Sequence, residues 1–143
     1  MKRVTLITGA SRGIGAATAR LCAADGHVVA INYRSDADAA ERVRTEIESA
    51  GGTAIAVQGD TGIEADILRM FGTVDQTLGT VTGLVNNAGI HGPRGRLDAL
   101  DADDISRVLA VNVQGCFLCA REAVKRMSTK HGGAGGAIVN VSS

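Results

Sequence analysis

The fold of this chain is decided by the stretch Thr8-Gly9-Ala10-Ser11-Arg12-Gly13-Ile14-Gly15. The apolar run Val4 to Thr8 comes before it and predicts a buried strand, and apolar residues at helical spacing follow it. Gly9 permits the turn out of the strand, Gly13 lets the backbone approach a pyrophosphate, and Gly15 lets the helix pack close to the sheet. The spacing T-G-x-x-x-G-x-G differs from G-x-G-x-x-G, but it still favours a nucleotide-binding turn. A glycine-rich turn without a ligand is the alternative.

The alternation of an apolar run with a helical pattern continues along the whole chain. Helices are expected between the strands, the last one long, from about Asp101 to Met127. Such alternation predicts a single α/β domain: a Rossmann-type, doubly wound parallel sheet with helices on both faces, ending after its fifth strand. Strands are expected at Val4 to Thr8, His27 to Tyr33, Thr53 to Val57, from Leu84-Val85 into Asn86, and Ala137 to Val141.

Three helix starts are predicted from polar residues that are followed by an acid three positions on. These are Ser35, Thr61 and Asp101, whose side chains can accept hydrogen bonds from the first amides of a helix.

Composition excludes several classes of partner. The 15 basic and 15 acidic side chains balance, which argues against nucleic acid or a membrane surface as a partner. No apolar run is long enough for a membrane span, and the N-terminus does not resemble a signal peptide. The odd number of cysteines indicates a reduced, cytoplasmic protein. Cys116 and Cys119 form C-x-x-C inside an apolar helical pattern, so we interpret them as buried small hydrophobic residues and expect no metal site.

The end of the second strand indicates which nucleotide binds. An NAD-type site places an acid there to bind the ribose hydroxyls, whereas this chain has Arg34. Arg12 from the glycine turn can reach the same place, and two guanidinium groups can bind a 2′-phosphate. Asp36 and Asp38 are interpreted as residues at the start of the next helix. The sequence therefore predicts NADP, with a merely solvated Arg34 as the alternative.

Several motifs together resemble the short-chain dehydrogenase/reductase family, and in particular its NADP-type bacterial members. They are the turn Thr8 to Gly15, the segment Asn86-Asn87-Ala88-Gly89 and the closing Ile138-Val139-Asn140-Val141-Ser142-Ser143. The resemblance implies hydride transfer between nicotinamide and a small carbonyl or alcohol substrate, and a dimer or tetramer in the full-length enzyme. It also places Asp60 and Thr61 beside the adenine and Asn87 to Gly89 beside its ribose. A strand-end or helix-cap role for Asp60, and a plain turn at the two asparagines, are the alternatives. The complete set of predicted cofactor residues is Gly9, Ser11, Arg12, Gly13, Ile14, Gly15, Asn32, Tyr33, Arg34, Ser35, Asp60, Thr61, Asn87, Ala88 and Gly89.

One polar residue interrupts the apolar stripe of the long helix. Asn112 lies between apolar positions such as Leu109 and Cys116, so its amide is expected to be buried and hydrogen-bonded. A purely structural amide remains the alternative, while the resemblance implies a catalytic asparagine that helps hold a proton relay. The resemblance also matches Ser143, with Ser142 beside it, to the serine that hydrogen-bonds the substrate oxygen.

The family further requires Tyr-x-x-x-Lys, in which the tyrosine transfers a proton while the nicotinamide transfers a hydride. The single tyrosine here is Tyr33, and Ala37 stands four residues on. Residues 1–143 are therefore interpreted as the incomplete, NADP-binding part of an NADP-dependent oxidoreductase, inactive alone. The alternatives are a non-catalytic nucleotide-binding module or an inactive truncation product. Arg34 and the Asn-Asn-Ala-Gly segment argue against another Rossmann-type protein such as a methyltransferase.

Overall fold

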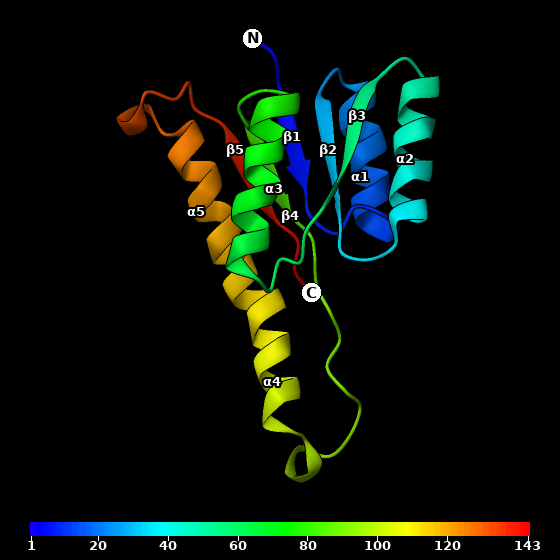
Figure 1. The fold of residues 1–143 in the computed structure, drawn as a ribbon, viewed down its shortest axis with the longest axis vertical. Coiled ribbons are helices and arrows are strands. Elements are labelled where there is room, and N and C mark those ends of the chain that lie inside the picture. The colour runs from blue at the N-terminus through cyan, green and yellow to red at the C-terminus, as the bar shows by residue number, and fades with distance from the viewer.

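In the computed structural model, which describes residues 1–143, five parallel strands form one sheet between two layers of helices (Figure 1). The order of strands across the sheet is β3-β2-β1-β4-β5. This confirms the predicted Rossmann-type, doubly wound arrangement. The strands are β1 (Val4–Ile7), β2 (Val28–Tyr33), β3 (Thr53–Gln58), β4 (Gly83–Asn86) and β5 (Ala137–Asn140).

Four helices cover the two faces of the sheet. Helices α1 (Gly13–Ala24) and α2 (Ala37–Ser49) pack on one face, and α3 (Glu64–Thr77) and α5 (Gly115–Met127) pack on the other (Figure 1). Each layer has its own apolar core, so the central strands are buried on both sides. This is why their sequences are continuous apolar runs rather than alternating patterns.

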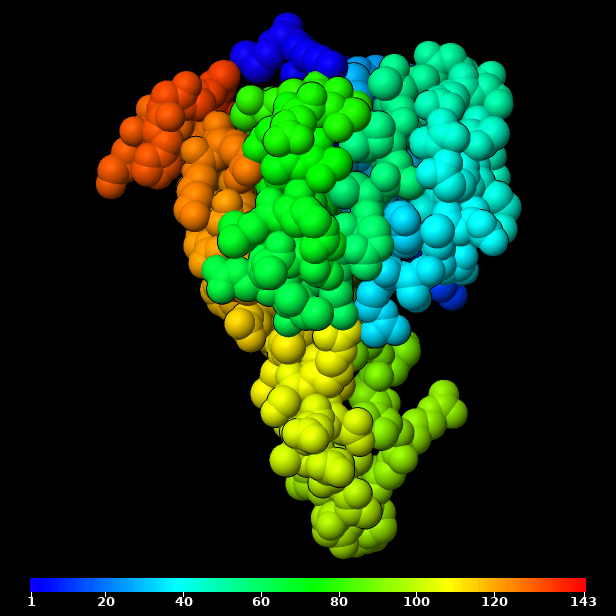
Figure 2. All heavy atoms as spheres, viewed as in Figure 1, coloured from blue at the N-terminus to red at the C-terminus, as the bar shows by residue number.

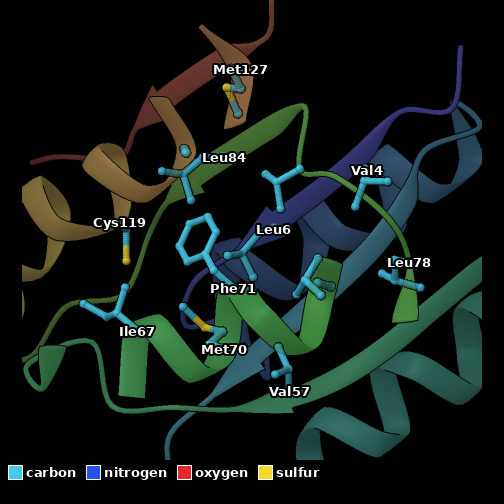
Figure 3. Close-up of a cluster of buried hydrophobic side chains, with 14 residues drawn as sticks. Val4, Leu6, Val57, Ile67, Met70, Phe71, Leu78, Leu84, Cys119 and Met127 are labelled. Atoms are coloured by element: carbon cyan, nitrogen blue, oxygen red, sulfur yellow. The ribbon is translucent and has the colours of Figure 1, made fainter. Parts of the chain in front are cut away.

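Strand β1 shows how one strand supplies both cores. Leu6 belongs to the cluster under α3 and α5, and its neighbour Ile7 belongs to the cluster under α1 and α2. Successive side chains of a strand point to opposite faces, which explains the division. Figure 3 shows Phe71 at the centre of the first cluster, beside Leu6 and Leu84. Because the chain has so few aromatic residues, small aliphatic side chains fill the rest of both cores.

The predicted long helix is present but is interrupted at its centre. It consists of α4 (Ala102–Leu109), a π-helical segment η2 (Ala110–Gln114) and α5. The sequence carries no Pro or similar signal for this interruption, and the periodicity alone predicted one regular helix. Helix α4 projects beyond the edge of the sheet (Figures 1 and 2), and Leu109 is 54% exposed on it. The apolar stripe is therefore buried along α5 but largely exposed along α4.

Two of the three predicted helix caps are wrong. Helix α2 is capped by Asp36 rather than Ser35, because the Asp36 carboxylate accepts a hydrogen bond from the Ala39 amide at 2.9 Å. Helix α3 starts after Ile63 without any side-chain cap, so Thr61 does not have the predicted role. The third prediction is confirmed, since Asp101 caps α4 by accepting from the Asp103 amide.

The three cysteines are unpaired, and Cys119 is buried among the apolar residues of α3 and α5. Burial raises the pKa of its thiol to about 12, which fits a small hydrophobic residue rather than a reactive thiolate. None of the helices combines the length and the apolar character that a membrane span requires.

Candidate nucleotide-binding site

A groove lies where the order of strands reverses. The chain runs outward from β1 through β2 to β3 and then returns to β4, on the other side of β1. The connections that leave β1 and β4 therefore diverge at their carboxyl ends, which is where open α/β sheets bind ligands. A cavity of about 730 Å³ occupies this position. Every predicted cofactor residue except Gly15 lines it, together with Asp36, Gly59, Ile90, His91, Arg107 and Val111, which the sequence analysis did not assign to the cofactor.

The glycine turn has the local geometry that a phosphate requires. Gly9 and Gly13 have positive φ angles, +59° and +58°, which side chains disfavour. A methyl group at Gly13 would meet no atom within 4 Å, so this position is open toward the groove. Helix α1 starts at Gly13, and the side chain of its N-cap residue, Arg12, accepts no hydrogen bond from the first amides of the helix. A phosphate oxygen is the natural partner for such amides, and the turn therefore fits a pyrophosphate.

Gly15 does not line the groove and has a packing role. A methyl group there would lie 2.5 Å from both Asn87 Nδ2 and the carbonyl oxygen of Gly9. The sequence predicted that Gly15 brings the helix close to the sheet. The close contacts are in fact with the turn itself and with the loop after β4, which this glycine allows to pack together.

Two side-chain amides hold the turn in place, Asn32 buried and Asn87 half-buried. Asn32 Oδ1 accepts a hydrogen bond from the Gly9 amide at 3.1 Å, and its Nδ2 donates to the carbonyl oxygens of Val57 and Gly59 at 3.3 and 3.0 Å. Asn87 Nδ2 donates to the carbonyl oxygens of Thr8 and Gly9 at 3.0 and 3.1 Å. Both side-chain amides are thus committed to backbone groups, and their contribution to a bound ligand is to position the turn.

Thr8 is a further positioning residue that the sequence analysis did not assign to the site. Its buried hydroxyl oxygen accepts hydrogen bonds from the amides of Asn87 and Ala88, both at 3.0 Å. It thereby fixes the loop after β4 against the end of β1. The signal in the sequence was its place as the first residue of the T-G-x-x-x-G-x-G motif, in which roles were assigned only to the glycines.

The end of the groove next to β2 is basic. Arg34 follows β2 and is exposed, and its guanidinium forms no ion pair within the chain. Arg12 reaches the same end from the glycine turn, where its Nη2 lies 3.6 Å from Asp36 Oδ2. The structure therefore brings the two predicted arginines into one groove, and it adds the carboxylate of Asp36, the residue that caps helix α2.

Asp60 lies at the end of β3 and is held by two donors. Its Oδ1 accepts from the Gly62 amide at 2.8 Å, and its Oδ2 accepts from Arg107 on α4 at 2.7 Å. Burial alone would raise the pKa of Asp60, but the hydrogen bonds from Arg107 and Gly62 outweigh it and hold the pKa below its usual range. Asp60 is thus a carboxylate acceptor at neutral pH.

The two predicted catalytic residues lie outside the lining of the groove. Asn112 is exposed rather than buried, because α4 and the start of η2 project from the body of the molecule. Its amide is nevertheless hydrogen-bonded as expected, accepting from the Ile90 amide and donating to the Ile90 carbonyl oxygen, both at 2.8 Å. Asn112 therefore holds the loop that borders the groove. Ser143 is exposed three residues beyond β5, and no hydrogen bond fixes its side chain.

The fold is Rossmann-like, and the uncapped glycine turn and the basic groove are features that such folds use to bind dinucleotides. The sequence model described as short chain dehydrogenase matches residues 3–143. The chain therefore belongs to the short-chain dehydrogenase family, as the resemblance of its motifs indicated.

Relatives with known sequences and structures agree with this assignment. An uncharacterized oxidoreductase of Escherichia coli, YgfF, is 51% identical over 98% of this chain and 57% of its own length. A short-chain dehydrogenase from Burkholderia cenocepacia, solved in complex with NADP, has a TM-score of 0.85 and 39% identity, covering 97% of this chain and 54% of its own. A blue fluorescent protein from a metagenomic library, solved with NADPH, has a TM-score of 0.88 and 36% identity, covering 99% of this chain and 56% of its own. The chain thus spans about half the length of these proteins.

Proposed function

We propose that residues 1–143 are the cofactor-binding part of an NADP-dependent oxidoreductase that reduces a small carbonyl substrate or oxidises the corresponding alcohol. The observation that carries this proposal is the basic end of the groove, where Arg34 stands in the place of an acid and Arg12 converges on it. The two relatives solved with NADP or NADPH support the same choice.

Each part of the groove has a proposed role toward the nucleotide. The amides of the glycine turn bind the pyrophosphate, and Arg12, Arg34 and Ser35 bind the 2′-phosphate. Asp60 and Thr61 contact the adenine, for which the ionised Asp60 carboxylate supplies an acceptor. The segment from Asn87 to Gly89 lies beside the ribose. When bound, the nicotinamide supplies or accepts the hydride.

The proton side of the reaction is assigned from family membership. We propose that Asn112 and Ser143 serve the proton relay and the substrate oxygen, and that turnover needs a Tyr-x-x-x-Lys pair in addition. Residues 1–143 offer only Tyr33, which lines the groove at the end of β2 and has Ala37 four residues on. This observation keeps a second candidate open, a nucleotide-binding module without turnover. An NADPH-oxidation assay against a panel of carbonyl compounds, run on a form of the protein that also carries a Tyr-x-x-x-Lys pair, separates the two functions.

The cofactor preference is tested by Arg34→Asp. Loss of a charge-assisted contact to the 2′-phosphate should weaken NADPH binding by about 1.5–3 kcal/mol, roughly 10- to 150-fold, and affect NADH far less. Both nucleotides would be titrated against the wild-type protein and the variant. Arg42→Asp is the control, because Arg42 is exposed on α2 and does not line the groove. Equal NADPH affinity in the Arg34 variant and the wild type would contradict the proposal.

A further inference from the structure

Asp36 is a carboxylate at the mouth of the groove with two separate contacts. Its Oδ1 caps helix α2 through the Ala39 amide at 2.9 Å, while its Oδ2 faces Arg12 Nη2 at 3.6 Å. The ion pair is longer than a hydrogen bond, and the side chains are 75% exposed for Arg12 and 43% exposed for Asp36. Arg12 is therefore held loosely by a neighbouring acid rather than fixed in place.

The charges that line the groove show why this pair matters. Three guanidinium groups face two carboxylates in the lining, and Arg107 with Asp60 forms a separate, closer pair at 2.7 Å. The remaining charges are Arg12 and Arg34 against Asp36. A phosphate that binds both arginines would therefore meet a net charge of +1 at this end of the groove, because Asp36 offsets one of the two guanidinium charges.

We propose that Asp36 is a specificity-determining residue that competes with the 2′-phosphate for Arg12 and so limits the preference for NADP over NAD. This inference rests on the proposed function. A phosphate that pairs with Arg12 takes the place of the Asp36 carboxylate and is repelled by it. The 2′-hydroxyl of NAD carries no charge and can donate a hydrogen bond to a carboxylate at this position.

Asp36 caps α2 with one carboxylate oxygen and faces Arg12 with the other, so a substitution can remove its charge without removing the helix cap. Asparagine caps helices about as well as aspartate, so Asp36→Asn keeps the contact to the Ala39 amide and removes only the charge. Asp38→Asn is the matched control. Asp38 lies in the first turn of the same helix and is exposed, but it neither lines the groove nor pairs with Arg12. The two variants therefore change the net charge and the helix terminus in the same way.

The experiment titrates NADPH and NADH against the wild-type protein and both variants by cofactor fluorescence, at low and at high salt. Because the pair is exposed, its removal should tighten NADPH binding by about two- to fivefold. NADH binding should stay the same or weaken, and Asp38→Asn should stay within about twofold of wild type for both nucleotides. The gain should shrink at high salt, where the Debye length falls to a few ångströms.

Thermal unfolding checks that both variants keep the fold. If Asp36→Asn is unfolded, Asp36→Ser replaces it, because serine is also an uncharged residue that caps helices well. A charge-removing Asp36 variant that binds NADPH no more tightly than Asp38→Asn overturns the inference while the proposed function stands. A wild-type protein that binds neither nucleotide overturns both. Tighter NADPH binding in the Asp36 variant, with no such gain in Asp38→Asn, supports the proposal that Asp36 competes with the 2′-phosphate for Arg12.

Discussion

Asn32 beneath the glycine turn and Asn112 on the projecting helical segment make similar bonds in opposite surroundings. Each side-chain amide accepts from one backbone N–H and donates to a backbone carbonyl oxygen, and the distances differ by only a few tenths of an ångström. Asn32 is 2% exposed, whereas Asn112 is open to solvent. Water can replace the partners of Asn112 if its amide is lost, whereas the carbonyl oxygens of Val57 and Gly59, which accept from Asn32, are buried. The comparison teaches that surroundings, not bond geometry, decide what an amide contributes to stability.

The largest effect is expected for Asn32→Leu. The leucine would leave the buried carbonyl oxygens of Val57 and Gly59, and the half-buried Gly9 amide, without their side-chain partner. Unsatisfied buried groups cost about 1–3 kcal/mol each, so we expect a loss of about 3 kcal/mol in the free energy of unfolding. For a domain of this size the melting temperature should fall by roughly 10 °C. Circular dichroism on heating measures both. A variant as stable as Asn112→Leu would break the comparison.

An intermediate effect is expected in the ion network between α3 and α5, where a charged group is buried rather than an amide. The Glu122 carboxylate is 5% exposed and contacts Lys125 at 2.9 Å and Arg126 at 3.2 Å. Burial would raise the pKa of Glu122, but the hydrogen bonds from Lys125 and Arg126 outweigh it and hold the pKa below its usual range. Glu122→Gln should therefore cost about 1–2 kcal/mol at neutral pH.

The pH dependence gives this prediction its control. A carboxylate with a lowered pKa in the folded state contributes its stability above the pKa of the unfolded chain, near 4.3, and loses it as the pH falls toward the folded value. The difference in unfolding free energy between wild type and Glu122→Gln should therefore be complete above about pH 5 and shrink below it. Denaturant unfolding at several pH values measures it. A difference that is constant from pH 7 to pH 3 would show that Glu122 contributes by shape alone.

The same contrast separates what the sequence could predict from what it could not. The strands and the nucleotide groove were predictable because each rests on a local pattern: a buried apolar run, or glycines at fixed spacing after it. Residues far apart in sequence then met at the groove because parallel strands end at one edge of the sheet. Arg107 was missed because its contact with Asp60 spans 47 residues and no local pattern encodes it.

The exposure of Asn112 was predicted wrongly for a related reason. A helical stripe of apolar residues shows that one face is apolar, but it does not show how far the sheet beneath the helix extends. Helix α4 runs past that edge, so its apolar residues have no layer to cover them (Figure 2). The π-helical segment at Asn112 was missed as well, because one extra residue in a turn barely changes the apolar period. Such segments are often found at functional sites, which fits the proposed role of this residue.

The smallest effect on stability, and the sharpest test of that role, is expected for Asn112→Leu. Because solvent can replace both partners, the free energy of unfolding should fall by less than about 1 kcal/mol. The loop it holds should nevertheless loosen, since the Ile90 amide donates to Asn112 Oδ1 and would lose its only side-chain acceptor. Hydrogen exchange at the Ile90 amide should accelerate while exchange in β1 and β4 stays unchanged. In a form of the enzyme that turns over NADPH, most activity should disappear although the variant is folded. Faster exchange at Ile90 with full turnover would make Asn112 a structural tether of the loop and remove it from the proton relay.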